Sequence, residues 1–280
     1  MRFVLVHGGF HGAWCWDRLI PELDKRGHTA VKVDHRDAVV DVIQAGDVLV
    51  GHSMGGFVTS MAADVAADRV HHVVYLAAGL PVEGQPMLAS SAGGLLDSRD
   101  MFELTDDGRR IKFRTAEAAI GFFFNDCPPE VAQWACDMLT PQPPSVFAEP
   151  ISVPRFWEAE LPRSLILGRR DHAGGNKAAV QEMIARLGVD PMWMDTSHSP
   201  FLSQPGSGRT PGNASSAPTG RSPPEVLNSG SLFVRWPRHR FGADFGDTTP
   251  LSASCDDEHV QRWDKGVRPV AAPDALLRRR

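Results

Sequence analysis

The sequence predicts an α/β fold in which about six mostly parallel strands form one sheet with helices on both faces. Two observations lead to this prediction. Short, unbroken apolar runs alternate along the chain with segments whose apolar residues recur at helical spacing. The apolar runs lack the alternation of a half-exposed strand, and unbroken runs are typical of parallel strands that are buried on both faces. Strands alternating with helices in this way favour a parallel sheet.

The first part of the chain follows this alternation closely. Residues 3–6 form an apolar run that ends at His7-Gly8-Gly9, which predicts a strand and a tight turn. Residues 17–25 carry apolar side chains at helical spacing, and Gly27 follows where a helix end favours glycine. By the same two patterns, further strands are predicted at 30–33, 47–50, 73–76, 165–167 and 191–194, and further helices at 37–44 and 57–67.

Residues 81–161 interrupt the alternation between the fourth and fifth strands. They contain three consecutive phenylalanines, 122–124, and two proline-rich joints, at 128–129 and 141–144. This composition predicts a mostly helical cap insertion. Insertions of this size near strand ends often form lids over active sites.

The composition changes at residue 204. Residues 204–280 are rich in Pro, Gly, Ser and Arg and show neither the helical nor the strand period. A segment of this kind buries too little apolar surface to offset its ordering entropy. We therefore expect one domain over residues 1–203, including the cap, followed by a disordered tail over 204–280. The alternative is a basic tail that binds an anionic surface.

Composition excludes several classes of protein. The 280 residues carry a net charge of −5, which gives no reason to expect a nucleic-acid or membrane-surface partner. No apolar run approaches the roughly 20 residues that span a bilayer, and the N-terminal run is too short for a signal peptide. The four cysteines have neither metal-ligand spacing nor a CxxC pair, so we expect free thiols, no metal and a cytoplasmic protein.

The strongest chemical signal is Gly51-His52-Ser53-Met54-Gly55, a G-x-S-x-G pattern between a predicted strand and a predicted helix. In this context the serine sits on a sharp turn as a nucleophile, and the glycines allow neighbouring segments to approach closely. The following helix start favours developing negative charge. The alternative is a glycine-rich turn that only packs a helix on a sheet.

A serine nucleophile needs a base and an acid that orients it. His198 follows the last predicted strand in a loop of small polar residues, and Asp171 follows the fifth strand, so both should reach the same sheet edge as Ser53. The order serine, acid, histidine matches α/β enzymes of this kind. Asp195 is the second candidate acid. The alternatives are a surface histidine at 198 and a surface ion pair for Asp171.

Acyl transfer also needs donors for the oxyanion. The backbone N–H of Met54, directly after the nucleophile, is one candidate. The turn His7-Gly8-Gly9-Phe10 after the first strand is suited to supply the other.

Residues 3–16, the Gly-His-Ser-Met-Gly-Gly segment and the spacing of Asp171 and His198 resemble the plant-type methyl esterase and hydroxynitrile lyase branch of the α/β-hydrolases. The resemblance covers roughly residues 1–202. It implies the α/β-hydrolase fold and catalysis by Ser53, Asp171 and His198. It also implies an oxyanion hole formed by the amides of Gly9 and Met54.

The same resemblance favours an esterase over a lyase. Related lyases carry threonine where Gly8 stands and lysine directly after the catalytic histidine, where this chain has Ser199. The resemblance therefore implies a serine carboxylesterase, which needs no cofactor. The apolar character of the predicted lid favours hydrophobic esters of small to medium size. Bulky aromatic or pyrethroid-like esters, which some relatives cleave, are a further possibility. Lyase, lactonase or amidase chemistry and a non-catalytic binding protein remain open.

Aromatic residues near these motifs predict an apolar substrate pocket. The residues expected to line it are Phe10, Trp14, Phe123 and Trp134. The expected partner is a small-molecule ester. The family's final amphipathic helix has no counterpart after Leu202, so apolar sheet surface near His198 could be exposed and drive homo-oligomer formation.

Overall fold

The structure, a computed structural model, describes residues 1–90, 99–175 and 177–206. The predicted tail lies outside the described residues from position 207 onward. Within the described part of the chain, every helix is too short or too polar to cross a bilayer.

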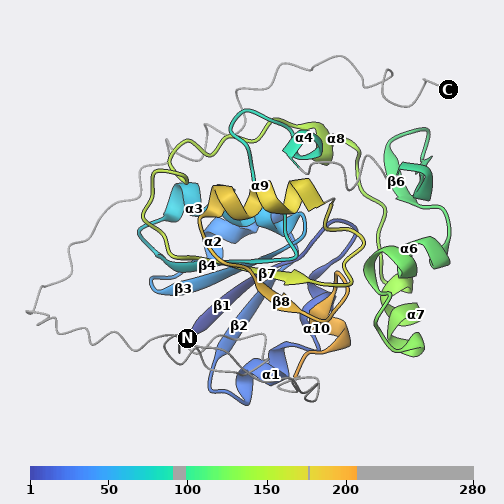
Figure 1. The fold of residues 1–280 in the computed structure, drawn as a ribbon, viewed down its shortest axis with the longest axis horizontal. Helices are drawn as coiled ribbons and strands as arrows, with labels where there is room; N and C mark the ends of the chain where they lie inside the picture. The colour runs from blue at the N-terminus through green and yellow to red at the C-terminus, as the bar shows by residue number, and fades with distance from the viewer. Residues whose placement is uncertain (91–98, 176, 207–280) are drawn as a thin grey trace, which may run out of the picture. The chain divides into compact units, whose positions relative to one another are not determined.

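Six strands form one sheet in the order β2-β1-β3-β4-β7-β8, and each neighbouring pair is parallel (Figure 1). The predicted fold class is therefore confirmed. Every residue of β3 is buried, as the unbroken apolar run predicts for a central strand. The strands are β1 Arg2–Val6, β2 Thr29–Val33, β3 Asp47–His52, β4 Val70–Leu76, β7 Arg163–Gly168 and β8 Met192–Met194.

Helices cover the sheet on both faces (Figure 1). In that view α2, α3 and α9 lie over one face, and α1 and α10 lie over the other. The predicted helix at 17–25 is shorter in the structure, because Pro21 stands at the first turn of α1 and favours a helix start there. The bounds are α1 Ile20–Asp24, α2 Val39–Val42, α3 Gly55–Ala66, α9 Lys177–Leu187 and α10 Pro200–Ser203.

The insertion between β4 and β7 contains an antiparallel hairpin besides its helices, which the sequence prediction missed. Strands β5 and β6 pair Phe102 with Phe113 and Thr105 with Arg110. Asp106, Asp107 and Gly108 close the hairpin with positive φ angles of 52°, 54° and 85°. The elements of the insertion are α4 Met87–Ser90, β5 Phe102–Thr105, β6 Arg110–Phe113, α6 Ala116–Phe123, α7 Pro129–Asp137 and α8 Ser145–Ala148.

The carboxyl ends of the parallel strands meet at one edge of the sheet. The turns that follow β1, β3, β7 and β8 carry Gly9, Ser53, Asp171 and His198 respectively. This edge is where open α/β sheets bind their ligands.

Candidate active site

Ser53 lies on the sharp turn between β3 and α3. Its φ of 53° is in the left-handed region, which a residue with a side chain rarely adopts. The turn is held at the serine carbonyl oxygen, which accepts hydrogen bonds from the N–H groups of Gly56 at 3.1 Å and Gly79 at 3.2 Å. Strained backbone that its surroundings hold in place is typical of functional sites.

The glycines of the G-x-S-x-G pattern are required by close packing. A Cβ on Gly51 would lie 2.6 Å from the carbonyl oxygen of Gly55, and a Cβ on Gly55 would lie 2.4 Å from that of Val6. Both neighbours are backbone atoms and cannot move aside cheaply. The pattern therefore lets α3 begin directly against β1 and β3, which places Ser53 at the sheet edge.

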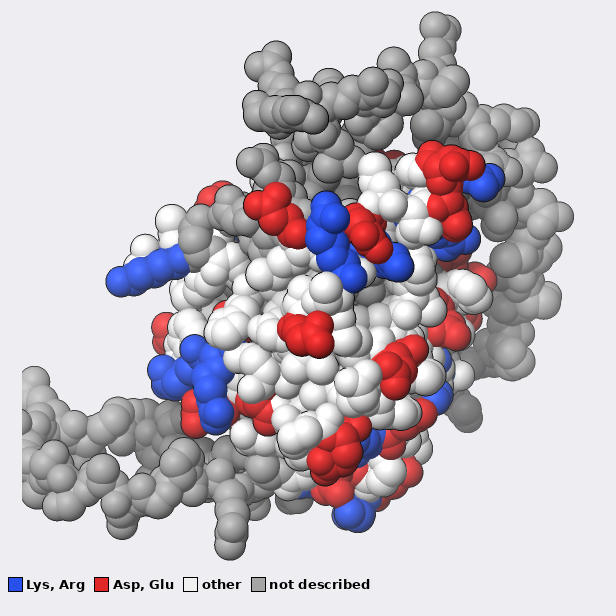
Figure 2. Space-filling view, turned by 90° about the vertical axis from the view of Figure 1, so that its right-hand side faces the viewer, with Lys and Arg blue, Asp and Glu red and all other residues white. Residues whose placement is uncertain are grey.

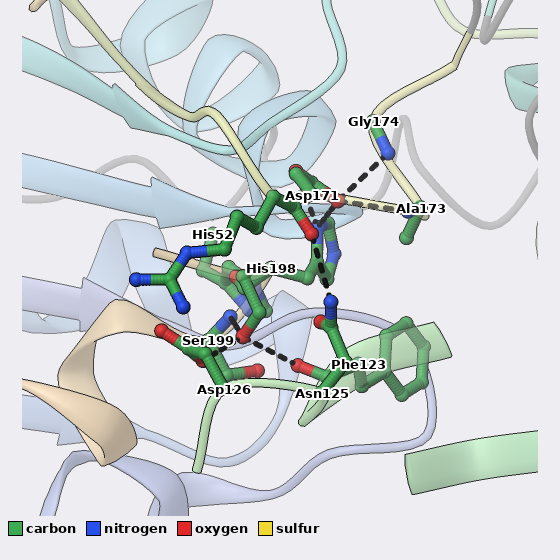
Figure 3. Close-up of polar contacts among 11 residues, drawn as sticks. His52, Phe123, Asn125, Asp126, Asp171, Ala173, Gly174, His198 and Ser199 are labelled. Carbon is green, nitrogen blue, oxygen red and sulfur yellow. Dashed lines mark hydrogen bonds and ion pairs between the residues drawn. The ribbon is translucent and has the colours of Figure 1, made fainter. Parts of the chain in front are cut away.

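His198 and Asp171 form a buried pair (Figure 3). Nδ1 of His198 lies 2.9 Å from Oδ2 and 3.0 Å from Oδ1 of Asp171. The N–H groups of Ala173 and Gly174 donate to Oδ1 at 2.8 and 2.9 Å, which fixes the carboxylate. The other ring nitrogen of His198, Nε2, is buried and has no hydrogen-bond partner among the described residues. It is therefore open to take a proton from a nucleophile in the adjoining cavity.

Asp195, the other candidate acid, does not contact His198. Its carboxylate forms a two-pronged ion pair with the Arg170 guanidinium, with both N–O distances at 2.9 Å. Asp171 is thus the acid that the structure brings to the imidazole. The surface ion pair that was the alternative for Asp171 is formed by Asp195 instead.

The two predicted oxyanion donors lie at the same cavity as Ser53. Gly9 and Met54 both line it, and neither N–H donates a hydrogen bond within the described residues. The carbonyl oxygen of Gly8 accepts from His7 Nδ1 at 2.8 Å and from the His11 N–H at 3.3 Å. Because a trans peptide points its C=O and N–H in opposite directions, these contacts turn the Gly9 N–H away from the His7 ring.

The cavity beside Ser53 has a volume of about 130 Å³. Of the predicted pocket residues, Phe10 and Phe123 line it. Trp14 and Trp134 lie outside its walls, contrary to the prediction, because they pack edge to face on each other at 5.2 Å and Trp134 is 39% exposed. Lining residues that the sequence analysis missed include Phe57, Leu80, Met87, Phe147, Met183 and Arg186.

Three further histidines are buried and uncharged at neutral pH. Burial lowers the pKa of His11 to about 3 and that of His72 to about 4. Burial also lowers the pKa of His52 well below the usual 6.5. Nε2 of His52 donates to the carbonyl oxygen of His198 at 3.0 Å, so this ring supports the loop that carries the candidate base.

These histidines predict a loss of stability in acid. In the unfolded chain they take up protons near pH 6.5, whereas the folded protein protonates His72 only near pH 4 and His11 near 3. The unfolded state therefore binds more protons below pH 6.5, and the free energy of unfolding falls as the pH falls. Each histidine contributes up to about 1.4 kcal/mol per pH unit.

Urea unfolding at pH 7, 6 and 5 measures this effect. The variant His72→Gln keeps a side-chain donor for Ser164 Oγ, which lies 3.0 Å from His72 Nε2. Its free energy of unfolding should depend less steeply on pH, by about one proton. An unchanged pH dependence in this variant would show that His72 titrates alike in both states.

No group of three or more His, Cys, Asp or Glu side chains in the described ranges is arranged to hold a metal ion. The described cysteines, Cys15, Cys127 and Cys136, are free thiols. Burial raises the pKa of Cys127 to about 12, with the charge of Asp126 adding to the effect, so this thiol stays protonated.

Comparison with known proteins places this geometry in a family. The profile described as "Alpha/beta hydrolase family" matches residues 3–207. Methylesterase 7 of Arabidopsis thaliana is 32% identical over 30% of this chain and 42% of its own length. Esterase PIR7B of Oryza sativa is 34% identical over 31% of this chain and 41% of its own length. The chain thus spans less than half the length of these two relatives. The pFDCC methylesterase MES16 of A. thaliana is 27% identical over 61% of this chain and 77% of its own length.

Solved structures share the fold at low sequence identity. An extracellular alpha/beta-hydrolase from a Paenibacillus species has a TM-score of 0.63 at 22% identity, covering 74% of this chain and 95% of its own. The pyrethroid hydrolase PytH has a TM-score of 0.59 at 21% identity, covering 74% and 93%. The resemblance inferred from the motifs is confirmed. Since the family profile spans most of the chain and the structure has the family's sheet, this chain belongs to the alpha/beta hydrolase family.

Proposed function

We propose that this protein is a serine esterase that hydrolyses hydrophobic carboxylic esters through an acyl-enzyme on Ser53. One arrangement supports the proposal above all. Ser53 and His198 line the same cavity, and the imidazole is held at Nδ1 by Asp171 while its Nε2 has no partner in the described structure. A nucleophile, a base and an acid in this relation are the parts that acyl transfer requires.

The proposed reaction proceeds in two stages. Ser53 Oγ attacks the ester carbonyl while His198 Nε2 takes its proton, and Asp171 keeps the other ring proton in place. The N–H groups of Gly9 and Met54 bind the oxyanion, and each donor is worth about 3–4 kcal/mol in the transition state. His198 then gives its proton to the leaving alcohol. Water cleaves the acyl-enzyme by the same route.

The walls of the cavity favour apolar substrates. Phe10, Phe57, Phe123 and Phe147 line it together with Leu80. Its volume of about 130 Å³ is near that of a cavity which takes one benzene ring. We therefore expect the buried group of the ester to be a short chain or a single ring. Pyrethroid-like or other bulky aromatic esters would have to extend beyond this cavity.

The surface over the insertion supports a substrate without negative charge. On the face that carries α6 and α7, charged side chains are separated by uncharged surface (Figure 2), and the two helices carry Glu117, Glu130 and Asp137 but no Lys or Arg. A surface of this kind does not attract an anionic ligand.

A panel of p-nitrophenyl esters from acetate to laurate, measured beside mandelonitrile, tests the proposal. We expect the highest kcat/KM for acetate to butyrate, a decline with longer chains, and no cleavage of the cyanohydrin. Gly8 supplies no hydroxyl and Ser199 no ammonium for a cyanohydrin. Cleavage of mandelonitrile without ester turnover would favour a lyase. Saturable binding of a substrate ester without any turnover would favour a non-catalytic binding protein.

A further inference from the structure

The end of α6 and the loop after it contact both loops that carry the predicted acid and base. We call residues 121–126 the clamp segment. The Asn125 side-chain amide donates to the carbonyl oxygen of Arg170 at 3.1 Å, next to Asp171. Nδ1 of His172, on the other side of Asp171, donates to the carbonyl oxygen of Gly121 at 2.9 Å. The loop of the acid is therefore fastened to the insertion on both sides of the carboxylate.

The clamp segment also fastens the loop of the base (Figure 3). The hydroxyl of Ser197 contacts the carboxylate of Asp126 and lies 3.3 Å from the carbonyl oxygen of Phe123. The hydroxyl has one proton, and the closer, charged carboxylate is the stronger acceptor. The N–H of Ser199 in turn approaches Ser197 Oγ at 3.5 Å. A short relay from Ser199 through Ser197 to Asp126 thus spans the backbone on both sides of His198.

The burial of these groups indicates that Asp126 does more than fill space. Ser197 is fully buried, and Oδ2 of Asp126 is a buried atom without a hydrogen-bond partner among the described residues. A half-buried carboxylate with one buried oxygen unpaired is costly for a protein to keep. An apolar residue in its place would avoid this cost if the position only filled space.

The ring of Phe123 connects the same segment to the substrate cavity. It stacks on the imidazole of His198 with ring centres 5.3 Å apart and planes 18° apart, and it lines the cavity. A substrate in the cavity therefore touches the segment that bonds the two catalytic loops.

From these contacts we infer that Asp126 is a positioning residue: through Ser197 it fixes the backbone of His198, so that the insertion and the catalytic base hold one geometry. The inference rests on the proposed esterase function. Asp126 touches no reacting atom. It keeps the imidazole at the angle that proton transfer from Ser53 requires. A misplacement of about 1 Å would be enough to lower the rate of this step.

The test compares Asp126→Asn, Asp126→Glu, Ser197→Ala and the double variant Asp126→Asn with Ser197→Ala. Turnover of p-nitrophenyl butyrate is measured per active site, counted by titration with a fluorophosphonate. We expect kcat to fall about 10- to 100-fold in Asp126→Asn and in Ser197→Ala, with KM changed less than about threefold. Asp126→Glu should recover part of the loss. The double variant should be no slower than the worse single variant, because Asp126→Asn weakens and Ser197→Ala removes the same relay.

A second readout separates positioning from a general loss of folded protein. The proton shared between His198 Nδ1 and Asp171 should give a downfield proton resonance in the wild type, which shifts or broadens in Asp126→Asn. Asp137→Asn is the matched control, since Asp137 is an exposed acid on α7 of the same insertion, bonded to Gln133 at 2.8 Å. It should leave kcat and the resonance unchanged.

The outcomes separate the positioning role from the proposed esterase function. Unchanged kcat per titrated site in Ser197→Ala, which removes the hydroxyl of the relay, or in the double variant should Ser197→Ala not fold, would overturn the positioning role. Fully additive losses in the double variant would also overturn it. Failure of the fluorophosphonate to label Ser53 in the wild type would instead refute the proposed esterase function.

Discussion

Replacing Ser53 with alanine is expected to lower kcat/KM for p-nitrophenyl butyrate by about 10⁴- to 10⁶-fold. The change removes one hydroxyl oxygen from a side chain that lines the cavity, and no hydrogen bond of the described structure uses that oxygen. The fold should therefore be retained. A loss of this size follows because the substitution removes the proposed nucleophile, and Nε2 of His198 has no hydrogen-bond partner among the described residues that could replace it.

Covalent labelling of Ser53 and a control substitution at an exposed serine complete this test. A fluorophosphonate should modify wild-type protein at Ser53 and leave Ser53→Ala unlabelled. Ser145→Ala removes an exposed hydroxyl at the start of α8 and should keep full turnover. Residual turnover in Ser53→Ala above about one hundredth of the wild-type rate would mean that another group or a water performs the attack.

The candidate nucleophile, acid and base could be predicted from the sequence because their signals are local. The glycines around Ser53 indicate that backbone segments approach closely there. The order of the strands alone brings Asp171 and His198 to the same edge of a parallel sheet. The helix α9 was not predicted, although Val180, Ile184 and Leu187 recur at helical spacing. The hairpin also left a signal, in the alternation of Phe102 and Leu104 with polar residues.

Other features depend on long-range packing that no local pattern records. Trp14 stands beside the oxyanion turn in the sequence, but its ring turns toward Trp134 and away from the cavity. Asp126 reaches Ser197 across 71 positions of the chain. Directions of side chains in an insertion are set by the fold around it, so the pocket walls were predicted less well than the residues at the strand ends.

Substituting Gly8 with alanine is expected to lower kcat about 100-fold or more, even though Gly8 contributes no side chain to the reaction. A Cβ at this position would lie 2.7 Å from the Cβ of Ser53 and 2.9 Å from Nδ1 of His52. Real Cβ atoms do not approach so closely, so one of these groups must move. Ser53 would shift with its nucleophilic oxygen. His52 would shift with the carbonyl of His198, which its Nε2 holds at 3.0 Å.

Gly121→Ala is the control for this substitution, since a Cβ on Gly121 meets nothing within 4 Å and the backbone carbonyl that His172 contacts is kept. In the helix α6 it should leave kcat unchanged and raise stability by about 0.5–1 kcal/mol. The measurements are kcat per titrated site and the thermal midpoint of each variant. The close contact between a Cβ at position 8 and Ser53 also predicts that Gly8→Thr alone does not create a lyase. The added hydroxyl comes with a Cβ that displaces Ser53. Full esterase turnover in Gly8→Ala would mean that Ser53 and His52 accommodate the methyl group without losing their alignment.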